Sequence, residues 1–209
     1  ELGICQYLSG DILSAVHTLY KANSLDPKDI NIQLLLSTFQ KEENTNNTKV
    51  NTNNYISNKS KVKLDSNPLI LNMPVEGELI EILYKIKARD QEKYQRPTYG
   101  NAIGSDYNFF ESSESAINNI KQKLITIATD SVKSEILISE SFFTIFRSGG
   151  GLKSHNHLGS LDMVEGLNIA SKKFSLVYYL SVGDQNCAEP GILKLENPDQ
   201  DIIPHNGLI

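Results

Sequence analysis

The feature that most constrains the fold of this chain is a histidine pair, His155 and His157, in a glycine-rich stretch between two apolar runs. The runs, residues 141–147 and 174–180, have the length and composition of buried β-strands. Side chains alternate along extended backbone, so the two histidines point to the same side. Asp162 follows closely and adds a carboxylate. This pattern predicts that His155, His157 and Asp162 supply half or more of a metal site at the rim of a sheet, with a plain surface loop as the alternative.

The first 41 residues read as helices whose small and apolar positions recur at a regular spacing. Small residues allow two antiparallel helices to approach closely, and Asp26-Pro27 ends the second helix. The spacing resembles a tetratricopeptide repeat, which implies a module that binds a protein partner; an ordinary helical hairpin is the alternative. The matched positions are Leu2, Gly3, Gly10, Ala15, Leu19, Ala22 and Pro27, and Leu34, Leu35 and Phe39 on the next helix would cover the exposed face.

An asparagine-rich tract separates these helices from the rest of the chain. It contains almost no apolar residue and cannot bury enough surface to offset the entropy lost on ordering. We therefore expect tetratricopeptide helices over 1–43, a linker over 44–67 and a second domain over 68–209. In the second domain, helical spacing predicts helices at about 75–93 and 114–129 that pack outside a sheet. The fold class is α+β.

Composition excludes several classes of partner. The net charge is -5 and no basic block is present, which argues against nucleic acid. No apolar run approaches the roughly 20 residues that span a membrane. The two cysteines lie in different segments and suggest no disulfide framework, which fits a cytoplasmic location.

The order of these parts resembles the prolyl 4-hydroxylase-like superfamily of iron(II)/2-oxoglutarate-dependent oxygenases, over residues 68–209. The motifs that carry it are Gly-Gly-Gly-Leu-Lys-Ser-His-Asn-His ending at His157, Ser-Leu-Val-Tyr-Tyr-Leu-Ser over 175–181 and Glu-Pro-Gly-Ile-Leu-Lys-Leu-Glu-Asn-Pro over 189–198. The resemblance implies a double-stranded β-helix (jelly-roll) core with flanking helices. It also implies a dioxygenase with Fe(II) and 2-oxoglutarate as cofactors, and with ascorbate as a possible reductant.

The same resemblance assigns roles to individual residues. His155 corresponds to the first iron ligand. The family has a carboxylate two residues later, where this chain has His157, so either His157 or Asp162 is the second protein ligand. Tyr178 and Tyr179 face opposite sides of their expected strand, so one would hydrogen-bond the cosubstrate while the other packs; the alternative is that both lie in the core.

Both ends of the sequence look cut. Glu1 falls inside an expected helix, and the family's distal histidine and cosubstrate-binding arginine would lie past Ile209. We therefore expect this piece by itself to be inactive.

Two other readings remain open. The spacing from Gly149 through His155 and His157 to Asp162 is close to the first cupin motif, although the second glycine of that motif is displaced to Gly166. A cupin would be a metal-dependent isomerase or a dioxygenase that does not use 2-oxoglutarate. The other alternative is a non-catalytic repeat scaffold with a degenerate barrel.

Overall fold

The computed structural model describes residues 1–50, 67–86, 89–90, 101–183, 186 and 191–209, with backbone alone at 45–50 and 89–90. These residues belong to two compact units, and each unit has its own hydrophobic core. The first unit comprises residues 1–62 together with 157–174. The second comprises residues 63–156 together with 175–209.

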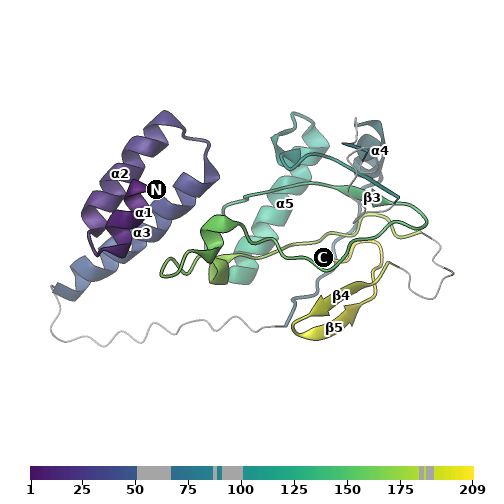
Figure 1. Ribbon diagram of the computed structural model, residues 1–209. Coiled ribbons are helices and arrows are strands. Elements are labelled where there is room, and N and C mark those ends of the chain that lie inside the picture. The colour runs from purple at the N-terminus through teal and green to yellow at the C-terminus, as the bar shows by residue number, and fades with distance from the viewer. Residues whose placement is uncertain (51–66, 87–88, 91–100, 184–185, 187–190) are drawn as a thin grey trace. The chain divides into compact units, whose positions relative to one another are not determined.

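Three helices that lie side by side make up most of the first unit (Figure 1): α1 (Leu2–Leu8), α2 (Ile12–Leu25) and α3 (Ile30–Val50). The close approach of α1 and α2 depends on Gly3, where a Cβ would lie 3.3 Å from Leu19 Cγ. The Asp11 side chain caps α2 by accepting the Ser14 amide at 3.1 Å. The helix ends at Leu25, just before Asp26-Pro27, as the sequence predicts.

The core of this first unit includes a segment that is distant in sequence. Residues 157–174 contain two short 3-10 helices, η3 (Ser160–Met163) and η4 (Ala170–Lys172). Between these helices, Leu167 and Ile169 are fully buried in the same cluster as Ala15, Leu19 and Phe39. The segment that follows the histidine pair is therefore part of the helical unit, an association that the sequence analysis did not anticipate.

The second unit is built on α4 (Gly77–Lys85) and α5 (Ser115–Val132), preceded by the 3-10 helix η2 (Phe109–Glu111). Leu79 and Leu83 of α4 and Ile117 and Ile120 of α5 form one buried cluster with Phe143. Phe143 lies in the apolar run 141–147, so that run shares one core with both helices.

The described strands form two small antiparallel sheets. One joins β1 (Arg89–Asp90), β2 (Ala102–Gly104) and β3 (Thr144–Phe146), with Ile103 opposite Ile145. The other is a hairpin of β4 (Leu193–Glu196) and β5 (Asp199–Ile202), visible as adjacent arrows in Figure 1. These elements make an α+β chain. The double-stranded β-helix and the tetratricopeptide repeat stay predictions.

The last residues of the second unit pair with two distant segments. The Leu71 and Ile209 backbones exchange hydrogen bonds of 3.0 and 2.9 Å, and the Tyr179 amide donates to the Leu208 carbonyl at 2.8 Å. Gly207 has φ +88°, and a Cβ there would lie 2.5 Å from the Met73 carbonyl oxygen. A residue without a side chain is therefore needed where these segments meet.

Some expectations differ from the structure or fall outside it. The helix expected over 75–93 ends at Lys85, and residues 89–90 form β1 instead. The helix α3 continues to Val50, into the expected linker. Residues 51–66 lie outside the described residues, as does most of the loop at 96–101, so the domain boundary within 44–67 stays a prediction. Among the described helices, none combines the length and the apolar character needed to cross a membrane.

Candidate functional site

The residues between β3 and the histidine pair are fixed by backbone hydrogen bonds near the end of β3. The Arg147 amide donates to the Asn101 carbonyl at 2.9 Å, and the Gly150 amide donates to the Arg147 carbonyl at 2.8 Å. A Cβ at Gly150 would overlap the Asn101 carbonyl oxygen. Gly149 has φ +80°, a conformation that side chains disfavour. Glycine is therefore required at both positions for the chain to leave the strand in this way.

His155 is exposed, and one of its ring nitrogens is engaged by its own loop. Its Nδ1 lies 2.8 Å from the Lys153 carbonyl oxygen. A hydrogen on Nδ1 donated to this carbonyl leaves Nε2 with its lone pair. Metal-binding histidines are commonly oriented in this way, with the second ring nitrogen hydrogen-bonded to a carbonyl or carboxylate.

His157 is also exposed, and the two histidines belong to different units. His155 belongs to the second unit, which contains the sheets, and His157 belongs to the first unit, which contains α1 to α3. Each histidine is therefore described within its own unit. In the part of the chain that the structure describes, no three His, Cys, Asp or Glu side chains gather in a way that would hold a metal ion.

Asp162, the third residue singled out as a metal ligand, is buried and already paired. Its Oδ2 accepts the Gly159 amide at 2.6 Å and lies 2.5 Å from Lys173 Nζ. The Asp162 side chain is 2% exposed and that of Lys173 is 31% exposed. The Asp162 carboxylate thus joins the two ends of the segment 159–173. Metal binding by Asp162 would require the Lys173 contact to break.

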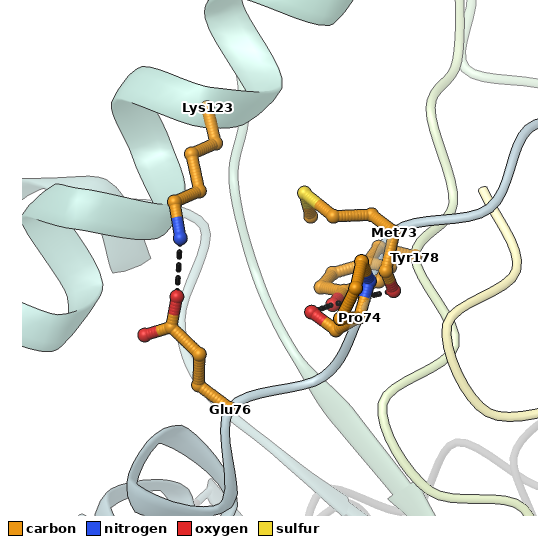
Figure 2. A network of polar contacts seen from close by, with 5 residues as sticks. All are labelled: Met73, Pro74, Glu76, Lys123 and Tyr178. Atoms are coloured by element: carbon orange, nitrogen blue, oxygen red, sulfur yellow. Dashed lines mark hydrogen bonds and ion pairs between the residues drawn. The ribbon is translucent and has the colours of Figure 1, made fainter.

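Tyr178 and Tyr179, the two candidate cosubstrate contacts, have different environments. The Tyr178 hydroxyl donates to the Pro74 carbonyl at 3.2 Å, with the Met73 carbonyl at 3.4 Å (Figure 2), and its ring packs against the core of the second unit. Burial, and to a smaller extent the Glu76 carboxylate, raise the pKa of Tyr178. Burial alone raises the pKa of Tyr179, whose backbone pairs with Leu208.

An exposed ion pair lies close to Tyr178 in Figure 2. Glu76, the residue before α4, accepts from Lys123 of α5. Both side chains are about half exposed, so the pair adds little stability by itself. It joins the start of one helix to the middle of the other, near the carbonyls that hold Tyr178.

The helical unit contains a pocket that the sequence analysis missed. Its volume is about 440 Å³, and its polar lining comes from α1, α3 and the segment after Glu165. The lining polar residues are Tyr7, Thr38, Lys41, Glu42, Asn168 and Lys172. The only signal in the sequence was the length of the loop at 158–173, because loops of that length are often functional.

Comparisons with known proteins add no assignment to these sites. No protein-family model matches the chain, and searches of curated proteins and of solved structures gave no match either.

Proposed function

We propose that this protein is an iron(II)- and 2-oxoglutarate-dependent oxygenase in which His155 and His157 bind the metal. The observation that carries the proposal is the order of parts: an apolar run, a glycine turn, His155-Asn-His157 and then the Tyr178-Tyr179 run. The glycine turn supports it further, because Gly149 and Gly150 occupy positions where a side chain would be strained or would overlap Asn101. The substrate to be oxidised is not identified by this order.

The donor groups available suit iron(II). The Lys153 carbonyl next to Nδ1 of His155 favours the tautomer whose Nε2 can bind a metal. We assign the second position to His157, because the Asp162 carboxylate is buried and held by Lys173 and the Gly159 amide. Bound iron would supply a Lewis-acidic centre with open positions for a 2-oxo acid and dioxygen.

Of the two tyrosines, we assign Tyr179 to the cosubstrate and Tyr178 to packing. The Tyr178 hydroxyl already donates to backbone carbonyls at Pro74 and Met73. We further propose that the helices at 1–43 bind a protein partner and that the protein acts in the cytoplasm. These two proposals rest on the repeat-like spacing of the helices and on the scarcity of cysteine.

Turnover of 2-oxoglutarate tests the proposal. Full-length protein supplied with iron(II) and ascorbate should convert 2-oxoglutarate to succinate, and His155→Ala should abolish the conversion. His205→Ala, at an exposed histidine outside the motif, is the matched control and should retain activity. Full activity in His155→Ala would exclude His155 as a ligand. Turnover that does not need 2-oxoglutarate would favour the cupin reading, and failure of iron-loaded protein to retain metal would favour a scaffold.

A further inference from the structure

The pocket of the helical unit brings together charged side chains from separate parts of the chain. Lys41 and Glu42 come from α3, and Lys172 comes from η4. Desolvation lowers the pKa of Lys172, the Glu42 carboxylate opposes this effect, and the like charge of Lys41 adds to it. Within the described part of the chain, Lys172 has no ion pair within 4 Å. Lys41 and Lys172 therefore line one pocket, and a bound anion would favour the charged form of Lys172, which desolvation disfavours.

The carboxylate in the same pocket has another partner. Glu42 accepts a hydrogen bond from the Tyr7 hydroxyl, and the Tyr7 ring stacks on Phe39 with a centroid separation of 3.9 Å. Burial, followed by the hydrogen bond and the charge of Glu42, raises the pKa of Tyr7 to about 12. The Glu42 carboxylate is thus shared with Tyr7, and Lys172 forms no ion pair with it within 4 Å among the described residues.

A buried hydroxyl group also opens into this pocket. Thr38 is only 8% exposed and lines the cavity. Its hydroxyl has no hydrogen bond to any described residue, and it is not among the side-chain atoms sealed from solvent. Buried polar groups are nearly always hydrogen-bonded, so this hydroxyl is available to a ligand atom in the cavity.

We propose that this pocket binds a small anion, through a carboxylate or phosphate group held by Lys41, Lys172 and Thr38. Asn168 also lines the pocket; its Oδ1 accepts from Ser171, so its amide group is the further polar contact that it offers. Glu42 disfavours a second negative group, so the ligand carries its charge at one end. The volume of about 440 Å³ lies in the range of small-molecule sites. This proposal is independent of the oxygenase activity.

The test is an amide NMR titration of the purified chain, without metal, using inorganic phosphate in one arm and lactate in the other. Saturable shifts at Thr38, Asn168 and Lys172 with either anion support the proposal, and the arm that saturates identifies the group recognised. Lys172→Gln should weaken binding about tenfold, since it removes a charge-assisted hydrogen bond. Lys21→Gln, at an exposed lysine of α2 outside the pocket, should leave binding unchanged.

A second variant separates ligand binding from a structural role. Thr38→Val keeps the shape of the side chain and removes a buried hydroxyl that has no hydrogen bond to any described residue. It should therefore preserve or raise the Tm while weakening anion binding severalfold. The proposal is overturned if neither anion saturates below about 10 mM. It is also overturned if Lys172→Gln and Thr38→Val both bind the anion as tightly as the wild type.

Discussion

Lys173 Nζ lies 2.5 Å from the buried Oδ2 of Asp162, and this ion pair closes the segment that follows the histidine pair. The same oxygen accepts the Gly159 amide, so the carboxylate joins both ends of the segment. Leu167 and Ile169, which lie between these ends, are buried against the helices. The ion pair closes the segment, and the two apolar side chains attach it to the helices.

The Asp162–Lys173 pair should contribute to stability mainly through the cost of leaving one partner alone. Lys173→Gln leaves a carboxylate that is 2% exposed without its cation and should lower the free energy of unfolding by about 2–4 kcal/mol. Asp162→Asn combined with Lys173→Gln should recover most of this loss. Urea denaturation of the single and double variants measures both effects. Lys172→Gln changes the neighbouring lysine and leaves this ion pair intact. Equal free energies of unfolding for Lys173→Gln and Lys172→Gln would therefore contradict a stabilising role of the Asp162–Lys173 pair.

The burial of Leu167 tests whether the segment is part of the helical core. Leu167 is 1% exposed, so Leu167→Ala should lower the free energy of unfolding by about 2–5 kcal/mol. Met163→Ala in the same segment removes a side chain that is 72% exposed and should change it by less than about 0.5 kcal/mol. Chemical denaturation distinguishes the two variants. Similar small losses in both would mean that the segment does not pack on the helices.

Local patterns predicted the pairing of α1 with α2 and the end of α2 well, because these features are encoded nearby. Asp26-Pro27 follows the last residue of α2, and Gly3 and Ala15 lie where α1 and α2 approach each other. Contacts between distant segments were not visible in this way. The two-residue strand β1 exists through its pairing with β2, and its sequence, Arg89-Asp90, has no strand preference of its own.

The candidate sites also differ in whether their residues are close together or far apart in the sequence. The His155-Asn-His157 motif and its glycine turn are local, and the sequence alone identified them. The partner of Asp162 lies eleven residues further along the chain, and the sequence pattern had assigned this carboxylate to the metal site instead. The pocket around Thr38 combines three separated segments and could not be found from spacing.

The burial of the Tyr7 hydroxyl, together with its hydrogen bond to Glu42, should make stability depend on alkaline pH. The pKa of Tyr7 is raised from its ordinary 10.0 to about 12, so the folded state favours the protonated phenol. The resulting stabilisation is complete below pH 10 and is lost as the pH rises toward 12. Tyr7→Phe retains the stacking on Phe39 and should remove this part of the dependence. Thermal melting of both proteins between pH 9 and 12 checks it, and parallel curves would refute the prediction.

The two tyrosines should differ in their effect on the proposed cosubstrate. In full-length protein, Tyr179→Phe should raise the KM for 2-oxoglutarate about tenfold, because it removes a hydrogen-bond donor assigned to that ligand. Tyr178→Phe should leave this KM near its original value, since the Tyr178 hydroxyl donates to the Pro74 carbonyl. Steady-state kinetics with varied 2-oxoglutarate separates the variants. The reverse ranking would exchange their roles.

The assignment of the metal ligands can be tested most directly by titrating the protein with cobalt(II), followed by the visible absorption of the bound ion. His155→Ala and His157→Ala should each weaken binding by at least about tenfold, whereas Asp162→Asn should bind cobalt as well as the original protein, because its carboxylate is committed to Lys173. Loss of binding in Asp162→Asn with retention in His157→Ala would reverse the assignment. Unchanged binding in His155→Ala would contradict the account of this site.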